Sequence, residues 1–411
     1  MKRLLHGIII LIAFGACNSA KHVQKFYFPP QWEPHQSVWL GWAQDSSLQQ
    51  VQLEIAKAVN PHVGLTILSR SASLLKTAFL QLSTAGIDTT KVKGYVHYIP
   101  NVFIRDAGPR FLKSASGQLA IADLGWNNYG YPKEFDVSQY SDKRGTIDNE
   151  LAGQMKLQVV STPIVGEGGG LEVSTNTMIC FSEMALQRNP GKSLEEIEKE
   201  YLRVYGKQKM IWLNRMPVMD KVVAGPKAGN YFGYGANGHI DEFVRFVNDS
   251  TLVISLIDSS ENSQDPISNA DYAIMQENLH ILRQARDING KPFKIISLPT
   301  PSYSLYSDKE ILTDSLKNNG DGKAFFKEFK SGDEIFWLNN VGYANFFITN
   351  GIVLVAKYWK EGLPEKERLK DEEARQTLQE IFPTRKIIQI NPMALNRNGG
   401  GMNCGTQQQP K

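Results

Sequence analysis

Thr251-Leu-Val-Ile-Ser255 and Phe293-Lys-Ile-Ile-Ser297 are two runs of strand-favouring residues, and between them Met275, Leu279 and Leu282 recur at helical spacing. Similar runs predict further strands at residues 37–42, 64–68, 95–99, 178–181, 344–348 and 352–355. Because strands and helices alternate along the chain in this way, we predict an α/β protein.

Two other helices are indicated as clearly. Ser193-Leu-Glu-Glu196 is a capping-box start, in which the serine and the second glutamate cap each other's backbone N–H groups. Ile197, Tyr201 and Val204 then fall on one face, as expected for a helix that buries one side. A further pattern of this kind occupies residues 374–381.

The composition is that of an ordinary globular protein, with 411 residues of which 42% are hydrophobic and 21% charged. The formal net charge is only +3, and the chain has no long basic run and no basic patch interleaved with aromatic residues. We therefore expect no nucleic-acid partner. No Pro/Ser-rich linker or low-complexity segment divides the chain after its first 21 residues, so we predict a single domain over residues 22–411.

The N-terminus has the features of an export signal. Lys2 and Arg3 precede an apolar run over residues 4–16, which is too short for a settled membrane-spanning helix. The junction at Cys17 resembles a bacterial lipobox, in which the cysteine is lipidated and becomes the mature N-terminus. We predict a signal peptide and short linker over residues 1–21, and an exported, membrane-anchored lipoprotein of the bacterial cell envelope. The alternative is an ordinary secretory signal with an incidental cysteine.

Two cysteines remain, Cys180 and Cys404, which are too few for a disulfide framework. Cys180 lies in an apolar run and is predicted to be inert core. Cys404 lies in Asn396-Arg-Asn-Gly-Gly-Gly-Met-Asn-Cys-Gly-Thr-Gln-Gln-Gln-Pro410, where glycines allow the backbone to approach a ligand closely. This stretch is either the setting of a nucleophilic thiol or a flexible, glycine-rich tail.

Polar residues gather at two places in the first half of the chain. Arg105 and Asp106 follow an apolar run, predicted to be a strand, and precede Gly108-Pro109. Side chains at a strand end, fixed by a rigid turn, are typical of α/β sites, but a local ion pair on a surface turn has the same pattern. Glu167 lies in Gly166-Glu-Gly-Gly-Gly170, either as a site acid or in a solvated turn.

His239 and Asp241 lie in Gly238-His-Ile-Asp-Glu-Phe-Val-Arg-Phe246, which runs into strand-favouring residues. If His239 begins this strand, the two side chains point to the same side. A His-x-Asp pair also occurs in metal sites, but no Cys/His cluster at ligand spacing accompanies it, so we predict no metal.

One cysteine, one histidine and several separated carboxylates indicate covalent chemistry on a cation. A guanidinium group is planar and always charged, and a carboxylate binds it through two oxygens. A thiolate can then attack its electron-poor central carbon.

A series of motifs connects these residues in order along the chain. They are Phe28-Pro-Pro-Gln-Trp-Glu-Pro-His-Gln-Ser-Val-Trp39, Phe103-Ile-Arg-Asp-Ala-Gly-Pro109, Asp123-Leu-Gly-Trp-Asn-Asn-Tyr-Gly130, Glu167-Gly-Gly, Gly238-His-Ile-Asp241, Tyr343-Ala-Asn-Phe346 and Cys404-Gly-Thr-Gln-Gln. The series resembles the agmatine deiminase and Porphyromonas-type peptidylarginine deiminase family, part of the guanidine-modifying superfamily. The resemblance spans nearly the whole chain after the signal.

This resemblance implies a five-bladed α/β-propeller of repeated ββαβ units around a central site, with neither metal nor organic cofactor. It implies that Cys404 is the nucleophile that attacks the guanidinium carbon. His239, held by Glu167, would protonate the departing ammonia and then activate water. A bound cation and a protonated His239 would both favour the thiolate.

The resemblance also implies that Asp106 and Asp241 clamp the guanidinium, and Asn345 is a further candidate for substrate contact. The expected activity is that of a hydrolase acting on the C–N bonds of linear amidines. It would convert the guanidinium of agmatine or of peptidyl-arginine to a ureido group plus ammonia, through a covalent thiouronium intermediate. The expected partner is thus a small guanidinium substrate or an arginine-containing peptide, and membrane contact is expected only through the lipid anchor.

Two neighbours of the expected nucleophile depart from the family pattern: Asn403 stands where family members often have histidine, and Gly405 where they have an aliphatic residue. A surface lipoprotein that binds guanidinium or arginine-bearing ligands without chemistry is therefore an alternative. An amidinotransferase with the same thiol chemistry is another. Neither the substrate nor the oligomeric state follows from the sequence.

Overall fold

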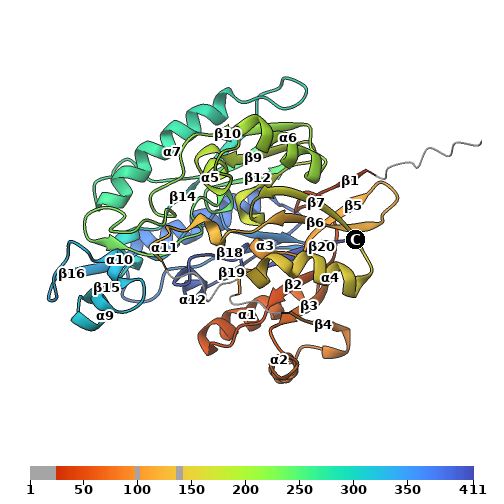
Figure 1. The fold of residues 1–411 in the computed structure, drawn as a ribbon, viewed down its shortest axis with the longest axis horizontal. Coiled ribbons are helices and arrows are strands. Elements are labelled where there is room, and N and C mark those ends of the chain that lie inside the picture. The colour runs from red at the N-terminus through yellow and green to blue at the C-terminus, as the bar shows by residue number, and fades with distance from the viewer. Residues whose placement is uncertain (1–24, 98–101, 136–141) are drawn as a thin grey trace, which may run out of the picture.

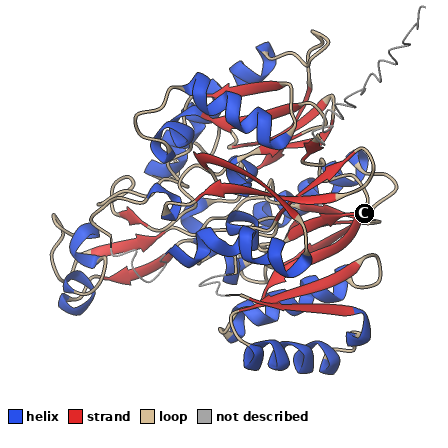
Figure 2. Cartoon of the chain, turned by 45° about the vertical axis from the view of Figure 1, so that its right-hand side comes forward, coloured by secondary structure: helices blue, strands red, loops and turns tan. Residues whose placement is uncertain are grey.

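The computed structural model describes residues 25–97, 102–135 and 142–411. This part of the chain is a mixed α/β fold with six β-sheets and helices packed around them (Figures 1 and 2). The predicted alternation of strands and helices is confirmed. The predicted signal peptide and Cys17 lie outside the described residues. Among the described helices, none is both long and apolar enough to cross a membrane.

Five of these six sheets share one strand pattern. In each, a first strand pairs antiparallel with a second, and the second pairs parallel with a third. The triplets are β20 (Gln407–Pro410), β2 (His35–Gly41) and β3 (Gly64–Ser69); β5 (Arg110–Ser114), β6 (Leu119–Gly125) and β7 (Gln158–Val165); β8 (Glu172–Val173), β9 (Thr177–Phe181) and β10 (Lys209–Leu213); β12 (Val244–Asn248), β13 (Thr251–Leu256) and β14 (Lys294–Pro299); and β17 (Phe347–Thr349), β18 (Ile352–Ala356) and β19 (Lys386–Ile390). Two of these sheets have an extra edge strand, β4 (Val92–Val96) or β1 (Phe26–Tyr27).

Helices connect the parallel strands of each sheet, because parallel neighbours require a crossover connection. They are α1 (Ser46–Val59) in the first sheet, α4 (Ile147–Met155) in the second, α5 (Ser182–Arg188) and α6 (Leu194–Tyr205) in the third, α7 (Pro266–Gln284) in the fourth and α11 (Glu365–Ile381) in the fifth. α2 (Ala72–Thr84) leads from β3 to β4 in the same way.

Helix α6 shows how local sequence sets these elements. The Ser193 side chain accepts a hydrogen bond from the backbone N–H of Glu196, and the Glu196 carboxylate accepts one from the backbone N–H of Ser193. Ile197, Tyr201 and Val204 are all buried. The predicted capping box and apolar face are thus confirmed, and each large aliphatic side chain buried in this way stabilises the fold by about 1.5–3 kcal/mol.

The C-terminal stretch is a packed strand, so the alternative of a flexible tail is wrong. β20 pairs antiparallel with β2 and completes the first sheet, joining the two ends of the described chain. Gln409 is buried, and its side-chain oxygen accepts hydrogen bonds from Ser37 Oγ and Trp39 Nε1, each at 3.0 Å. This pairing fixes the position of Cys404, which lies just before β20.

The sixth sheet also has one antiparallel and one parallel pair, but its parallel strand comes before the other two strands in the chain instead of following them through a helix. It is therefore not one of the five repeats, and it projects at the left of Figure 1. A separate apolar cluster holds it, with Phe135, Phe232, Phe325, Phe326 and Ile335 among its members. Its elements are β11 (Tyr231–Phe232), β15 (Asp308–Ile311) and β16 (Glu334–Trp337), with α8 (Tyr303–Tyr306), α9 (Asp314–Asn318) and α10 (Gly322–Phe325) in the connections.

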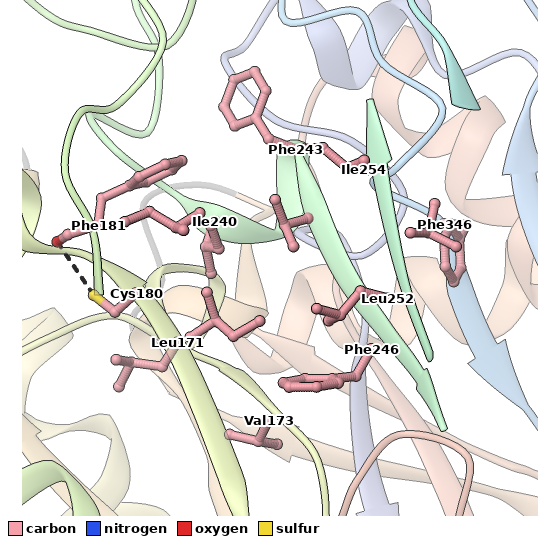
Figure 3. Packing of buried hydrophobic residues seen from close by; sticks show 14 of the residues in the cluster. Leu171, Val173, Cys180, Phe181, Ile240, Phe243, Phe246, Leu252, Ile254 and Phe346 are labelled. Carbon is pink, nitrogen blue, oxygen red and sulfur yellow. Dashed lines mark hydrogen bonds between the residues drawn. The ribbon is translucent and has the colours of Figure 1, made fainter. Parts of the chain in front are cut away.

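The largest apolar core includes residues of the third, fourth and fifth sheets. Figure 3 shows Leu171, Phe181, Phe246 and Phe346 among its side chains. Cys180 is fully buried there, with Sγ 3.4 Å from the carbonyl oxygen of Phe181. Burial, followed by the charge of Glu167, raises the pKa of this thiol. The prediction that Cys180 belongs to the core is confirmed.

Three strand predictions need correction. The strand predicted at 95–99 begins earlier, as β4. The strand predicted at 344–348 begins only with β17, because the carbonyl oxygens of Ala344 and Phe346 accept hydrogen bonds from the buried guanidinium of Arg245. The residues before Gly108 are not a strand end but a short helix, α3 (Ile104–Ala107).

Candidate active site

The polar side chains singled out from the sequence converge on one place, at the same point of each repeated sheet. Each lies shortly before the first strand of its sheet. In chain order these residues are Asp106 before β5, Glu167 before β8, His239 and Asp241 before β12, Asn345 before β17 and Cys404 before β20. All are at most 3% exposed. α3 packs against the turn η5 (Gly168–Gly170), and η5 packs against the turn η6 (Ile240–Glu242).

Cys404 is 1% exposed, and its sulfur has three polar side chains as neighbours among the described residues, besides the backbone N–H of Gly401. Asn345 Nδ2 donates to Sγ at 3.2 Å, and Sγ lies 3.3 Å from Glu242 Oε1 and 3.9 Å from Asp241 Oδ2. Burial, and then the charges of Asp241, Glu242 and Asp106, raise the pKa of the thiol well above its ordinary range. Cys404 therefore rests as a thiol.

Asn345 fixes the loop that carries this thiol. Its side-chain oxygen accepts hydrogen bonds from the backbone N–H groups of Asn403, at 2.7 Å, and Cys404, at 3.3 Å. Asn345 therefore positions the Cys404 thiol, whereas the substrate contact expected of it stays a prediction.

His239 lies between two carboxylates. Its Nδ1 is 3.5 Å from Asp106 Oδ1, and its Nε2 is 3.7 Å from Glu167 Oε2. Burial works to lower the pKa of the imidazole, but the charges of Asp106 and Glu167 outweigh it and raise this pKa to about 9. At neutral pH His239 is therefore an imidazolium and can donate a proton.

Glu167 is held as a carboxylate by a partner that the sequence did not reveal. Arg188, from the end of α5, donates from Nε to both oxygens of Glu167, at 2.9 and 3.2 Å. Burial works to raise the pKa of Glu167, but Arg188 and His239 outweigh it and lower this pKa to about 2. Glu167 thus keeps its negative charge beside His239 throughout the neutral range.

Asp106 and Asp241 are the two carboxylates that are expected to hold a cation. Tyr129 donates its hydroxyl hydrogen to Asp106 Oδ2 at 3.0 Å, and Asn403 Nδ2 donates to Asp241 Oδ2 at 2.6 Å. In each case one carboxylate oxygen accepts a hydrogen bond from the protein, and the other has no hydrogen-bond partner among the described residues. Burial, with the charges of Asp241 and Glu167, raises the pKa of Asp106 to about 6 although His239 opposes this rise.

The two unpartnered oxygens and one imidazole nitrogen surround a single point beside Gly169. A methyl group at Gly169 would lie 2.5 Å from His239 Nδ1, and 3.1 Å from both Asp106 Oδ1 and Asp241 Oδ1. These three atoms are buried and have no hydrogen-bond partner among the described residues. Buried polar atoms are normally paired, and although Nδ1 of the imidazolium is itself a donor, the two carboxylate oxygens fit a ligand that donates hydrogen bonds. The carboxylates favour a cationic one.

The sequence-based placement of His239 in a strand is wrong. His239 precedes the turn η6, and the strand β12 begins only at Val244. The Asp220 carboxylate stabilises this turn by accepting hydrogen bonds from the backbone N–H groups of Ala236, Gly238 and His239 at 2.7–2.8 Å. Gly238 has φ +107°, which a β-strand does not allow. His239 and Asp241 reach the site from a tight turn instead of from one face of a strand.

The interpretation of Arg105 as part of a surface turn is also wrong, since Arg105 and Asp106 are both buried. Arg105 Nε donates to the carbonyl oxygen of Asn403 at 2.8 Å, and Nη2 donates to Gln408 Oε1 at 2.9 Å. Arg105 thereby holds the cysteine loop, while its neighbour Asp106 faces the site.

The glycine run before Cys404 is required for packing. A Cβ on Gly400 would lie 2.8 Å from the Phe103 ring and 3.0 Å from Cys404 Cβ. A Cβ on Gly401 would lie 2.6 Å from Asn345 Oδ1. These contacts are closer than any side chain tolerates without displacement, so the run brings the backbone against the site.

Three buried side chains, one of them Cys404, lie close enough together to be considered as metal ligands. Ligand atoms of Asp241, Glu242 and Cys404 lie within 4.8 Å of one another in the described structure. The same spacing suits a thiol that exchanges a proton with a carboxylate. We therefore do not assign these residues to a metal, and the predicted lack of a cofactor stays a prediction.

A cavity of about 350 Å³ leads to the cluster. Asp106 and Tyr129 belong to its lining. Arg144, which is buried, and Arg397, which is paired with Asp308, also line it, and Asp106 is the one carboxylate among its described lining residues. The described lining thus carries charges of both signs.

These features define a class: an α/β protein of repeated sheets in which a buried cysteine, an imidazolium and carboxylates face a cation site. The sequence profile of the Porphyromonas-type peptidyl-arginine deiminase family matches residues 27–410. The chain belongs to this family.

Relatives and solved structures extend the match. A protein of Legionella pneumophila (strain Paris), provisionally named an agmatine deiminase, is 28% identical over 410 residues, covering 96% of this chain and 98% of that protein. An agmatine deiminase of Pseudomonas aeruginosa (strain LESB58) is 25% identical over 409 residues, covering 96% and 98%. The solved agmatine deiminase of Enterococcus faecalis shares the fold, with a TM-score of 0.70 at 23% identity over 94% of this chain and 96% of that one. Family membership supports guanidine deiminase activity, the hydrolysis of a C–N bond.

Proposed function

We propose that this protein is a cysteine-dependent deiminase that converts a guanidinium group and water to a ureido group and ammonia. The observation that carries this proposal is the point beside Gly169, where three unpartnered buried atoms meet. A guanidinium offers N–H donors in a plane together with a positive charge, which is what Asp106 Oδ1 and Asp241 Oδ1 require.

The first half of the reaction would release ammonia. With the guanidinium held by Asp106 and Asp241, Cys404 Sγ adds to its central carbon. His239, as an imidazolium, then gives its proton to the departing nitrogen. Ammonia leaves, and the substrate stays bonded to Sγ as a thiouronium.

The second half would release the product. His239, now neutral, takes a proton from a water molecule that attacks the thiouronium carbon. The C–S bond breaks, and a ureido product leaves. Glu167 and Asp106 stabilise the imidazolium that forms again, which explains why His239 lies between two acids at 3.5 and 3.7 Å.

The pH dependence of this reaction follows from the raised pKa values of two groups. Asp106 must be ionised to hold the cation, and His239 must be protonated to release ammonia, with pKa values of about 6 and about 9. Because Asp106 titrates above the ordinary range of an aspartate, acid inactivation should occur about two pH units earlier than usual. We expect kcat/KM to rise through about pH 6, stay level, and fall through about pH 9. Initial rates of ammonia release across this range test the profile, and full activity at about pH 5 would contradict it.

The far end of the substrate is assigned from the proposed export of the protein. The names of the relatives point to agmatine, whose far end is an ammonium. Among the described lining residues, Arg144 is buried and Arg397 is paired with Asp308 at 2.9 Å, so we draw no charge preference from them. A protein exported to the cell envelope meets peptides more readily than it meets agmatine. We therefore propose arginine, or a peptide with an accessible arginine, in preference to agmatine.

A panel of substrates tests both the deiminase activity and the choice of substrate. Ammonia and ureido product are measured with agmatine, free arginine, and peptides with internal or C-terminal arginine. We expect turnover of at least one arginine substrate with a kcat/KM at least about tenfold above that for agmatine, a difference of about 1.4 kcal/mol. A preference for agmatine would overturn the substrate assignment. Turnover of none, by folded protein, would overturn the deiminase proposal itself.

We also propose that the five repeated sheets are the blades of an α/β-propeller with the site at its centre. The shared strand pattern supports this, as does the position of one site segment before the first strand of each sheet. A crystal structure in which the five sheets do not follow one another around the site would contradict it.

The sequence of the first 21 residues supports a further proposal, that the protein is exported and anchored by a lipid on Cys17. Cys17→Ala should move the protein from the membrane fraction to the soluble one. Membrane association that is unchanged in this variant would contradict the anchor.

A further inference from the structure

We propose that Glu242 is the base that accepts the proton of the Cys404 thiol, so that a carboxylate and not His239 activates the nucleophile. This inference rests on the proposed deiminase function. It assigns a catalytic role to a residue that neither the sequence motifs nor the comparisons single out.

The contacts of the sulfur carry the inference. Within the described residues, the polar side chains that contact Cys404 Sγ are those of Asn345, Glu242 and Asp241, and the backbone N–H of Gly401 is a further donor to it. No hydrogen bond of the described structure joins Sγ to the ring of His239. Asn345 Nδ2 is a donor and cannot take a proton. Glu242 Oε1, at 3.3 Å, is the nearest acceptor to the thiol.

Asp241 is less suited to this task although it is also close. Its Oδ2 is 3.9 Å from Sγ and already accepts from Asn403 Nδ2 at 2.6 Å. Its Oδ1 faces the point beside Gly169, where the cation would bind. Of the two consecutive acids of η6, Asp241 therefore faces the substrate and Glu242 faces the nucleophile.

The surroundings of Glu242 favour proton uptake. The residue is 1% exposed, and its Oε2 has no hydrogen-bond partner among the described residues. The ionisable groups that interact with it are Cys404, Asp241, His239, Asp220, Tyr358 and Tyr303. Burial, followed by the charges of Asp241 and Asp220, raises the pKa of Glu242 well above its ordinary range. Its basicity is thereby brought toward that of a thiolate, as proton transfer between them requires.

The step balances in atoms and electrons. As Sγ bonds to the guanidinium carbon, the S–H bond breaks and its proton goes to Glu242, while the π-electron pair of one C–N bond moves to nitrogen. His239 protonates the nitrogen that leaves. After water adds, the C–S bond breaks and Sγ takes its proton back from Glu242. The surplus proton of the added water ends on ammonia, as ammonium, and nothing is oxidised or reduced.

The test compares Glu242→Gln with Asp241→Asn in the full chain, using whichever guanidinium substrate the wild type turns over best. Glutamine keeps the shape of Glu242 but has no basic oxygen. We expect Glu242→Gln to lower kcat about 100-fold or more while KM changes less than about threefold. Asp241→Asn should instead raise KM strongly, because it removes a charge from the cation site.

Glu242→Ala with added formate distinguishes a base from a packing residue, and it serves also if Glu242→Gln does not fold. A small carboxylate can occupy the space left by the side chain, so we expect formate, and not chloride, to restore part of kcat in proportion to its concentration. A kcat within about threefold of wild type in Glu242→Gln, or a folded Glu242→Ala that formate does not rescue, would overturn the inference. A wild type that releases no ammonia would overturn the deiminase proposal instead.

Discussion

Replacing Cys404 with serine is expected to abolish ammonia release, lowering kcat by about 10⁴-fold or more, while the protein still binds its guanidinium substrate. A serine hydroxyl is far less nucleophilic than a thiolate, and the described site places no imidazole beside it to act as its base. The carboxylates Asp106 and Asp241 remain, so the substrate Kd should change less than about fivefold. Isothermal titration calorimetry and an ammonia assay measure the two quantities on the same sample.

Cys180→Ser is the matched control for this variant. It makes the same chemical change at a buried cysteine outside the site, where the new hydroxyl can donate to the carbonyl oxygen of Phe181, which lies 3.4 Å from Sγ. It should keep kcat within about twofold and lose stability of about 1–3 kcal/mol. If Cys404→Ser retained turnover, covalent chemistry would be excluded. If wild type and Cys404→Ser bound ligand alike and neither released ammonia, the protein would be a binder of guanidinium ligands.

Gly169→Ala is expected to block the site without removing any charged group. Its methyl group would occupy the point between His239, Asp106 and Asp241, at 2.5 to 3.1 Å from their unpartnered atoms. The guanidinium would lose both its space and its hydrogen bonds there. We expect kcat/KM to fall about 100- to 1,000-fold, mainly through KM. Steady-state kinetics with ammonia detection measures the loss.

Gly405→Ala serves as the control for this substitution. Gly405 is next to the nucleophile, but a Cβ there would meet its nearest atoms, on Gly401 and Leu395, at 3.5 Å, an ordinary contact. It should keep kcat/KM within about threefold. Wild-type kinetics in Gly169→Ala would mean that the substrate binds elsewhere, whereas an equal loss in both variants would point to general disturbance of the loop.

The sequence sufficed to predict the class of the fold, because strand and helix periodicities are local properties. β13, α7 and β14, for example, follow from residues between 251 and 299 alone. The repeat itself was less visible, since the first sheet is completed by β20 from the other end of the chain. Pairing between residues so far apart leaves no local signal.

The ionisable members of the site could be named from motif order, but their local structure could not. His239 lies in a turn because the Asp220 carboxylate accepts hydrogen bonds from three backbone N–H groups there. No sequence pattern predicts that Asp220 contacts this turn. Arg188 is likewise 21 residues from the Glu167 that it pairs with, on the far side of β8 and β9. Such partners are set by tertiary packing, which periodicity does not report.

The two residues that depart from the family pattern turn out differently. Asn403 is part of the site framework, since it donates to Asp241 at 2.6 Å and accepts from Gln31 Nε2 at 2.7 Å. It therefore orients the acid that is expected to hold the cation. Gly405 has room for a methyl group, so this difference from the family pattern leaves the other residues of the site in place.

The central claim is that Cys404 forms a covalent bond to the carbon of a guanidinium. It is tested most directly by mixing wild-type protein with its best guanidinium substrate, quenching in acid within the first turnover, and measuring the mass of the peptide that contains Cys404. The account predicts that this peptide gains the mass of the substrate minus ammonia, and that the gain disappears when turnover is complete. Steady release of ammonia with no such adduct at any quench time, and with turnover retained in Cys404→Ser, would contradict it.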